Sequence, residues 1–355
     1  MRVAIRVDSS AAIGYGHLSR TLNIALELRS RGFLVYFICR DFESSGVHWI
    51  TAANFEVVKL PQSRPPRVVA NPKPKHLSWL GVSLDEEIAV VQSALKERGI
   101  VDWLLIDSYA LDRRFESAMR TYTRKIAVLD DLADRAHECD LLIDGAFLRE
   151  AGDYSSLVSK RCKLLCGSQY QPLRSDYGRF RALAMPRRFP PKTVLVSMGG
   201  IDSIGLIAVA LNALAKSRFA NAALVAVLSS RAPRIAEYQA LGGKLGLKID
   251  WRFDTDDMPL LILRSDLGVG ALGVSAYERA CLGLACVTAA AADNQRENLA
   301  RLGAAGAVIA EETIGLALER LDEARFRRCE RAAFEICDGL GAARICEAMQ
   351  SAALR

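Results

Sequence analysis

Short apolar runs of strand length recur along the chain and alternate with segments in which apolar residues have helical spacing. Helical spacing follows the first strand of each half, over residues 18–28 and 206–214, and Ser83 has the pattern of a capped helix start. This alternation is typical of an α/β protein built from Rossmann-like halves. The strands that we predict lie at residues 3–7, 33–38, 55–60, 103–109, 126–131, 141–144, 164–167, 193–197, 223–228, 248–253, 266–270 and 285–289.

A change in composition divides the chain near its middle. Residues 185–191 are rich in proline and arginine, and the strand and turn pattern restarts just after them. A chain of 355 residues is also long for a single hydrophobic core. We therefore predict two Rossmann-like domains, at 1–184 and 192–355, which face a ligand-binding cleft.

A second stretch rich in proline and basic residues, 61–75, interrupts the pattern of the first half. It has no hydrophobic periodicity, so we expect a surface loop there. The simpler interpretation is a tolerated insertion, and the alternative is a basic flap that closes over an anionic ligand.

The most informative stretch is residues 8–20, which contain the turn between the first strand and the first helix. Ligands of open α/β sheets bind at the carboxyl ends of strands, and Gly14 and Gly16 let the backbone come close to one. A dinucleotide fingerprint needs a third glycine where Ser19 stands, which argues against an NAD site. His17 stands in the first helical turn, where the helix dipole favours a neutral, basic imidazole. It is either a catalytic base or a residue that caps the turn.

Acidic side chains follow several strands of the first half. Asp107 ends one strand, Asp130 and Asp131 end the next, and Asp144 ends a third. Because strand ends of one sheet share an edge, we expect these residues and Tyr109 to converge on one crevice. For each aspartate taken singly, a cap for the following helix is the simpler interpretation.

The second half contains a candidate anion site. Gly273, Val274 and Ser275 open a predicted helix, where unpaired N–H groups, the helix dipole and a hydroxyl suit a diphosphate without a metal. Glu278 follows in the first turn of the same helix. It either accepts hydrogen bonds from the hydroxyls of a ribose or complements the helix dipole.

Composition narrows the classes of partner. Lys and Arg outnumber Asp and Glu by 47 to 41, a net charge of +6 that suits an anionic ligand and is too weak to indicate nucleic acid. No apolar run reaches the length of a membrane span, and the N-terminus enters a strand directly. The nine cysteines lack Cys-x-x-Cys spacing, which predicts reduced thiols in a cytoplasmic protein and no zinc site.

An ordered set of motifs carries a resemblance to a known family. The motifs are Gly-x-Gly-His at 14–17, Met-Gly-Gly-x-Asp at 198–202, Tyr-Glu-Arg-Ala-Cys-Leu-Gly-Leu at 277–284 and Ala-Asp-Asn-Gln at 292–295. With them, the chain from Arg2 to about Gly306 resembles the UDP-sugar hydrolases of pseudaminic acid biosynthesis, which act on UDP-2,4-diacetamido-2,4,6-trideoxy-β-L-altropyranose. That family is similar in fold to the two-domain glycosyltransferases, so the resemblance implies a glycosyltransferase-B-like fold.

The resemblance also implies a role for each matching residue. His17 would be the general base that takes a proton from the water attacking the anomeric carbon, with inversion and with no metal or other cofactor. The sugar pocket of the family matches Asp8, Gly14, Gly16, Tyr109, Arg174, Asn294 and Gln295. Its UDP-binding region matches Gly199, Gly200, Gly273, Val274, Ser275 and Glu278. The implied partner is a small-molecule UDP-sugar, with neither nucleic acid nor membrane, and a monomer is favoured.

Three places depart from the pattern of the family, all in the first half. They are Ser108, the pair Gly145 and Ala146, and the pair Gln171 and Pro172. All three lie on the side expected to hold the sugar, so they bear on the identity of the sugar rather than on UDP. Three alternatives stay open: a UDP-sugar-dependent glycosyltransferase, a hydrolase for a related nonulosonic acid precursor, and a non-catalytic nucleotide-sugar binder.

Overall fold

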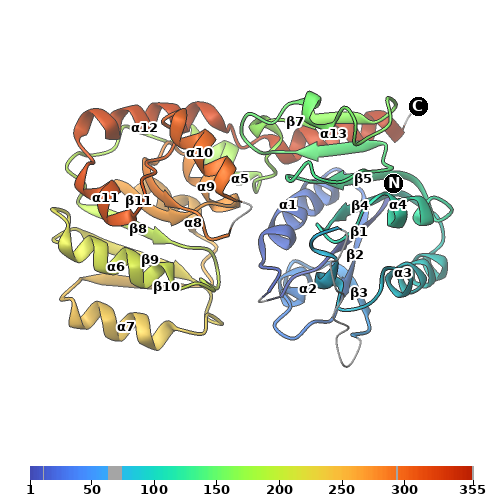
Figure 1. Cartoon of the computed structure of the whole chain (residues 1–355), viewed down its shortest axis with the longest axis horizontal. Helices are drawn as coiled ribbons and strands as arrows, with labels where there is room; N and C mark the ends of the chain where they lie inside the picture. The colour runs from blue at the N-terminus through green and yellow to red at the C-terminus, as the bar shows by residue number, and fades with distance from the viewer. Residues whose placement is uncertain (11, 63–73, 293–294, 354–355) are drawn as a thin grey trace. The chain divides into compact units, whose positions relative to one another are not determined.

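The computed structural model describes residues 1–10, 12–62, 74–292 and 295–353 and divides into two compact units (Figure 1). The first unit consists of Met1–Arg174 together with Gly341–Arg355, and the second unit of Ser175–Leu340. Each unit contains a parallel sheet with helices, which confirms the predicted α/β class. Most of the predicted loop 61–75 and the predicted ligand residue Asn294 lie outside the described residues.

The first unit is built on a parallel seven-stranded sheet with the order β3-β2-β1-β4-β5-β6-β7. Apolar clusters cover both of its faces, which explains why its strands are nearly continuous apolar runs. The strands are β1 (Arg2–Val7), β2 (Leu34–Arg40), β3 (Glu56–Leu60), β4 (Val101–Asp107), β5 (Thr123–Leu129), β6 (Leu141–Asp144) and β7 (Lys163–Cys166). The helices are α1 (Gly16–Ser30), α2 (Val47–Ala52), α3 (Leu84–Arg98), α4 (Arg113–Met119) and α13 (Gly341–Ala353), with the 3-10 turns η1 (Leu77–Leu80), η2 (Ala151–Tyr154) and η3 (Ser168–Tyr170).

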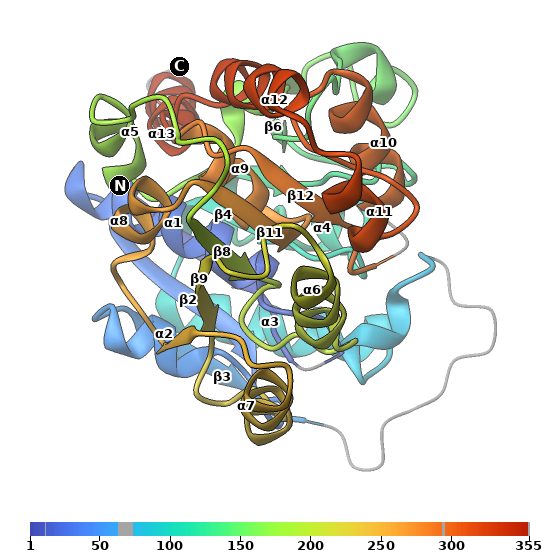
Figure 2. The same cartoon turned by 90° about the vertical axis from the view of Figure 1, so that its left-hand side faces the viewer.

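The second unit has a parallel five-stranded sheet with the order β10-β9-β8-β11-β12. Its helices α6 and α11 pack side by side and bury their apolar faces in the core of this unit (Figure 2). The strands are β8 (Thr193–Ser197), β9 (Ala223–Leu228), β10 (Ile249–Phe253), β11 (Leu267–Ala271) and β12 (Cys286–Ala289). The helices are α5 (Asp176–Arg181), α6 (Leu206–Lys216), α7 (Ile235–Lys244), α8 (Met258–Arg264), α9 (Val274–Cys281), α10 (Arg296–Ala304), α11 (Ile314–Glu319) and α12 (Glu323–Ile336).

The boundaries of the two units differ from the predicted domain boundaries in two places. The chain leaves the first unit after Arg174, ahead of the predicted linker 185–191. The last helix, α13, belongs to the first unit, so the prediction of one C-terminal domain over 192–355 is wrong for these residues. The reason is apolar packing between α13 and α1, which share one buried cluster through Leu18, Ile24, Leu28, Ile345, Cys346 and Met349.

The strand order reverses beside the first strand of each unit. In the first sheet, β1 lies between β2 and β4, and in the second sheet β8 lies between β9 and β11. At such a point, the chain segments that follow two adjacent strands run to opposite faces of the sheet. A crevice then forms at the carboxyl ends of these strands, where α/β proteins bind ligands. His17 follows β1, and Gly273 follows β11. The structure therefore puts both sets of candidate residues at these reversal points.

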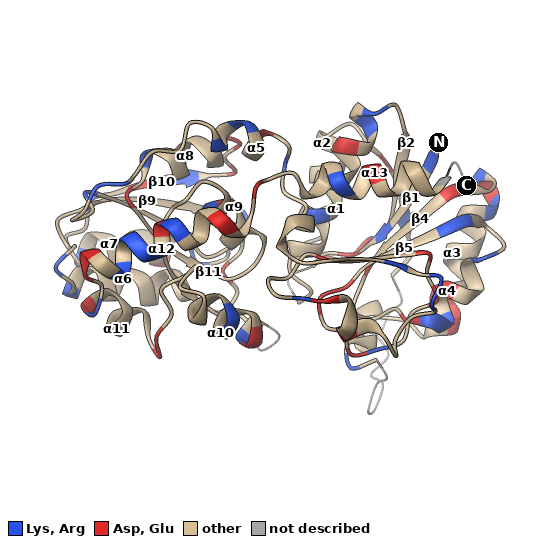
Figure 3. Ribbon diagram, turned by 90° about the horizontal axis from the view of Figure 1, so that it is seen from above, with Lys and Arg blue, Asp and Glu red and all other residues tan. Residues whose placement is uncertain are grey.

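Charged residues of both signs occur together on the helices. Helix α12, for example, carries interspersed acidic and basic side chains (Figure 3). In the part of the chain that the structure describes, no helix has both the length and the apolar composition to cross a membrane.

Candidate active site

The turn between β1 and α1 brings His17 to the edge of the first sheet. Gly14 adopts a φ of +83°, a backbone conformation that side chains with a Cβ rarely take, and its N–H donates to the Ser10 carbonyl at 2.8 Å. Gly16 is the first residue of α1, and the space where its Cβ would stand is open. The tight turn ends where the helix begins, so His17 projects from the first turn of α1.

His17 pairs with a carboxylate from the neighbouring strand. Its Nδ1 lies 2.6 Å from Oδ1 of Asp107, the last residue of β4, and both side chains are buried. A carboxylate accepts the Nδ1 proton and so leaves the lone pair of a neutral ring on Nε2. Within the described residues, Nε2 of His17 has no hydrogen-bond partner. This is the arrangement of an oriented general base.

Arg20 holds the carboxylate of Asp107 in place. The Nε of Arg20 donates to Oδ2 of Asp107 at 2.6 Å, and a terminal nitrogen donates to Oδ1 at 2.7 Å. The other terminal nitrogen donates to Asp131 at 2.8 Å. Burial opposes ionisation of Asp107, but the charges of Arg20 and His17 outweigh it and lower the pKa of Asp107 to about 2. The partner of His17 is therefore an anion throughout the neutral range.

Aromatic rings surround the imidazole. The ring of Tyr109 meets that of His17 edge to face, with centroids 4.4 Å apart, and its hydroxyl donates to Asp131. Burial and the charge of Asp131 raise the pKa of Tyr109, so its hydroxyl keeps its proton. Trp79, from η1, lies 6.3 Å from His17 and 5.8 Å from Tyr109, again between ring centroids. These rings shield one side of His17 from water.

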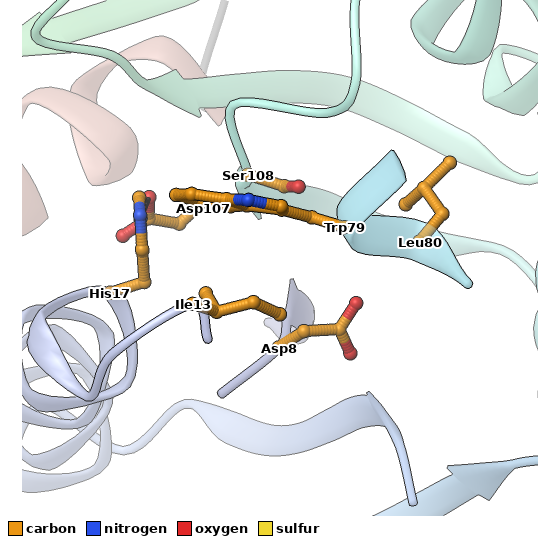
Figure 4. Close-up of a pocket in the computed structure, with 7 residues that line it drawn as sticks. All are labelled: Asp8, Ile13, His17, Trp79, Leu80, Asp107 and Ser108. Carbon is orange, nitrogen blue, oxygen red and sulfur yellow. Dashed lines mark hydrogen bonds and ion pairs between the residues drawn. The ribbon is translucent and has the colours of Figure 1, made fainter. Parts of the chain in front are cut away.

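A pocket of about 220 Å³, including its part open to solvent, adjoins this group (Figure 4). Figure 4 shows the indole of Trp79 edge-on between Ser108 and Ile13, with His17 at one end of the pocket and Leu80 at the other. Its lining residues are Asp8, Ile13, His17, Trp79, Leu80, Asp107 and Ser108.

Asp8 lines the pocket but is also part of a buried ionic network. Both of its oxygens accept from Arg6 at 2.6 Å, and Oδ1 also accepts from the backbone N–H of Arg40 at 2.7 Å. Arg6 in turn donates to Glu87 at 2.7 Å. Only Oδ2 of Asp8, with one donor, has capacity left to accept from a ligand. Arg174 is half-buried at the end of the first unit.

The second unit assembles its predicted residues on one sheet edge. Gly199 and Gly200 follow β8, and Gly273 precedes α9 directly after β11, the strand paired with β8. Val274 and Ser275 form the start of α9, with no side-chain cap and no acidic residue in the first turn. The side chain of Gln295 reaches this turn: its Nε2 lies 3.9 Å from where a Cβ on Gly273 would stand. Glu278 is half-buried on the same helix, but it is the fifth residue of α9 and so lies beyond the first turn in which it was predicted.

Two of the aspartates named from the sequence have local structural roles. Asp202, from the Met-Gly-Gly-x-Asp motif, accepts from the backbone N–H groups of Leu206 and Ile207 at 2.7 and 2.8 Å and so anchors the start of α6. Asp130 accepts from the N–H of Ala133 at 2.9 Å. For Asp107 the cap interpretation is wrong, because its oxygens bind His17 and Arg20.

Asp144 belongs to a second buried acidic cluster in the first unit. The hydroxyl of Tyr154 lies 2.8 Å from Asp144 and 2.9 Å from Asp130, so one phenolic proton serves two carboxyl groups. Arg149 forms an ion pair with Asp144 at 2.6 Å. Burial and the nearby charge of Asp131 nevertheless raise the pKa of Asp144 to about 7. This carboxyl group therefore takes up a proton near neutral pH.

This proton uptake makes the stability of the protein depend on pH. Because the folded pKa of Asp144 is above that of an unfolded aspartate, the folded state binds more protons between about pH 4 and about pH 7. Over that window Asp144 lowers the free energy of unfolding as the pH rises, by up to about 1.4 kcal/mol per pH unit. We expect D144N to flatten the dependence, measured by urea unfolding from about pH 5 to about pH 8. D153N, at a half-exposed neighbour of Arg149, is the control; parallel curves for D144N and the wild type would contradict the assignment.

Sequence reasoning identified His17 and Tyr109 but missed residues that complete the group. Arg20 lies three residues after His17 on α1, a spacing that places both on one helix face and is visible in the sequence. Asp107 and Asp131 were recognisable as strand-end acids, but their partners were not. Trp79 and His76, whose rings are 4.6 Å apart, follow the loop 61–75 and have no sequence signal that links them to His17.

Comparison with known proteins agrees with the fold and finds a relative by sequence. No family model matches the chain. The chain is 27% identical over 203 residues to the UDP-2,4-diacetamido-2,4,6-trideoxy-β-L-altropyranose hydrolase of Campylobacter jejuni, a match that spans 57% of this chain and 61% of that relative.

Solved structures match over nearly the whole chain. MurG of Acinetobacter baumannii has a TM-score of 0.64 at 15% identity and covers 99% of both chains. UGT2 of Phytolacca americana, complexed with UDP-2-fluoroglucose and pterostilbene, has a TM-score of 0.67 at 12% identity and covers 100% of both. The UDP-GlcNAc 2-epimerase of Neisseria meningitidis has a TM-score of 0.57 at 12% identity, with 99% and 100% covered. The chain thus has the predicted glycosyltransferase-B-like fold of two parallel-sheet α/β units, and its sequence is similar to that of a UDP-sugar hydrolase.

Proposed function

We propose that the chain is a UDP-sugar hydrolase in which His17 is the general base. The observation that carries the proposal is the pair of His17 and Asp107, which leaves Nε2 without a partner beside a pocket at the reversal point of the first sheet. In this proposal the first unit holds the sugar and the second unit binds UDP. The position of His17 in the first unit and of the α9 terminus in the second unit supports such a division.

The chemical step follows from the position of the base. The oxygen of a water molecule attacks the anomeric carbon, and its proton passes to Nε2 of His17. The bond between that carbon and the phosphate oxygen breaks, and UDP leaves with the electron pair. Attack opposite the leaving group inverts the configuration. Asp107, held as an anion by Arg20, stabilises the imidazolium that forms.

The leaving group needs charge stabilisation more than protonation. The second pKa of a phosphate group is about 6, so UDP departs as an anion near neutral pH. The start of α9 offers backbone N–H groups and the positive end of a helix dipole without an acidic side chain in its first turn. Among the described residues, no group of three or more His, Cys, Asp or Glu side chains is arranged to hold a metal ion. We therefore propose a metal-independent reaction that depends on the helix terminus.

The finer proposal concerns the sugar. We propose UDP-2,4-diacetamido-2,4,6-trideoxy-β-L-altropyranose as the substrate and 2,4-diacetamido-2,4,6-trideoxy-L-altrose as the product, in the biosynthesis of pseudaminic acid. The name of the Campylobacter relative supports this choice. A pocket lined by Trp79, Leu80 and Ile13 is also compatible with a sugar that carries methyl and acetamido groups. A hydrolase for a related nonulosonic acid precursor is the nearest alternative.

A UDP-sugar-dependent glycosyltransferase is the second candidate function. The match to UGT2 of Phytolacca americana, solved with UDP-2-fluoroglucose and pterostilbene, supports it at the level of the fold. In a transferase, an acceptor hydroxyl would replace water at Nε2 of His17. The two functions share the base and differ in the nucleophile.

One experiment separates these proposals. We would follow the purified protein by NMR with the diacetamido UDP-sugar and, in parallel, with UDP-GlcNAc, in buffer with EDTA and without an acceptor. We expect UDP and inverted free sugar from the first compound only, at the same rate with and without EDTA. Loss of activity in EDTA that Mg²⁺ restores would contradict the metal-independent step. UDP binding without turnover of either compound would favour the transferase or a different sugar.

A further inference from the structure

The buried arginine of α9 is the feature that the proposed reaction does not yet use. Arg279 is 1% exposed, although an arginine normally keeps its guanidinium in water or against a carboxylate. One of its terminal nitrogens donates to the carbonyl of Ala271 at 2.7 Å. Within the described part of the chain, its Nε and its other terminal nitrogen have no hydrogen-bond partner. Among the described residues, no acidic side chain forms an ion pair with it.

Two glycines of β11 make room for this side chain. A Cβ on Gly270 would stand 2.6–2.7 Å from the guanidinium, and a Cβ on Gly268 would stand 3.2 Å from the Cδ of Arg279. Glycine inside a strand is otherwise unfavourable, because it gives no side chain to pack and costs conformational entropy. The absence of a side chain at Gly270 therefore makes the space that the guanidinium occupies, and any other residue at this position would displace it.

The guanidinium lies below the first turn of α9. Helical side chains lean toward the N-terminus of their helix, so that of Arg279 runs back from the second turn along β11. It ends at Ala271, the last residue of β11 and two residues before Gly273. The same turn exposes the start of α9, which has no side-chain cap. A fixed positive charge thus lies behind a helix terminus that already favours anions.

An unpaired buried charge is unfavourable in the ligand-free protein. A guanidinium without a counter-ion loses its hydration and recovers little from one carbonyl. An anion bound at the turn would supply the missing partner through a medium of low dielectric, where charge interactions are strong. We infer that Arg279 is the positioning residue for the diphosphate of the nucleotide: it offsets the phosphate charge from behind the turn and orients the Ala271 carbonyl away from it. This inference rests on the proposed function.

The test uses three variants of the whole chain. R279M removes the charge and fills the volume, R279Q removes the charge but keeps a donor for Ala271, and R279K keeps the charge. The matched control is R187M, because Arg187 is also buried in the second unit but donates to the carbonyls of Leu263 and Leu282. For each protein we would measure the melting temperature without ligand and the affinities for UDP, UMP and uridine by calorimetry.

The inference predicts effects of opposite sign on stability and binding. We expect R279M and R279Q to melt at or above the temperature of the wild type, because an unpaired buried charge is gone. We expect both variants to bind UDP with an affinity roughly tenfold or more below that of the wild type. Their affinity for UMP should decrease less, and their affinity for uridine should stay within about twofold of the wild type. R279K should retain most of the UDP affinity. R187M should keep the ratio of UDP to uridine affinity of the wild type.

Other outcomes would overturn the inference. R279M and R279Q could instead melt at a lower temperature than the wild type and keep its ratio of UDP to uridine affinity. In that case Arg279 only stabilises the packing of α9 on β11. If R279M does not fold, R279Q against R279K still separates charge from packing. If the wild type does not bind UDP, the proposed function fails. The role of Arg279 toward an anion would then still hold if the wild type binds inorganic pyrophosphate and R279Q does not. If the wild type and R279Q bind pyrophosphate equally well, that role is also ruled out.

Discussion

Replacing His17 by asparagine is expected to lower turnover of the UDP-sugar by roughly a hundredfold or more, because the step then has no base to take the proton of water. UDP affinity should stay within about twofold of the wild type, since the candidate UDP residues belong to the second unit. The measurement is the rate of UDP release at saturating substrate, together with calorimetry of UDP binding.

The control for this variant is another histidine of the first unit. His48 lies on α2 and forms no hydrogen bond with Asp107, so H48N should keep the activity of the wild type. If UDP binding of H17N declined in step with its activity, His17 would be a structural residue of the turn. An H17N protein as active as the wild type would remove the base from the mechanism altogether.

The second large effect is expected for D107N. An amide cannot hold the Nδ1 proton of the imidazole as a carboxylate does, so the tautomer with its lone pair on Nε2 is no longer enforced. We expect turnover to decrease by roughly ten- to a hundredfold with little change in KM. In the H17N background D107N should cause almost no further decrease, because a positioning residue acts only through the residue that it positions.

The same variant has a distinct effect on stability. Folding lowers the pKa of Asp107 to about 2, so the wild type gains stability from it above about pH 4 and loses that gain as the pH falls toward about pH 2. D107N should be less stable than the wild type at neutral pH, because Arg20 keeps only one carboxylate partner. This difference in the free energy of unfolding should shrink in acid, and urea unfolding at neutral and at acidic pH would measure it.

For activity, a purely structural role of Asp107 would give losses in D107N and H17N that add up in the double variant.

The alternating pattern of the chain was sufficient to predict most of the architecture. Ser83 illustrates why: its Oγ accepts from the N–H of Glu86 at 3.2 Å, so the start of α3 is decided by residues next to each other in the chain. Buried parallel strands can also be recognised in the sequence, because burial on both faces requires a continuous apolar run. These features depend on local sequence, and the predicted strands are all present in the structure.

Features that depend on pairing between distant segments were beyond the sequence. His17 and Asp107 are 90 residues apart, and they meet only because β4 pairs with β1, a neighbour relation that no local pattern states. For Asp107 taken singly, a helix cap was the simpler interpretation. The return of α13 to the first unit was missed for the same reason: its apolar face shows that it needs a partner, but not which one.

The return of α13 also determines the order in which the molecule can be completed during synthesis. All of the second unit, Ser175–Leu340, leaves the ribosome before Gly341, so it can close its core while the chain is still growing. The first unit begins earlier but must wait, because Ile345 and Met349 cover the apolar face of α1 only after the whole second unit has been synthesised. Its nascent form therefore exposes that face throughout the synthesis of its neighbour, and exposed apolar surface of this kind makes a folding intermediate prone to aggregation.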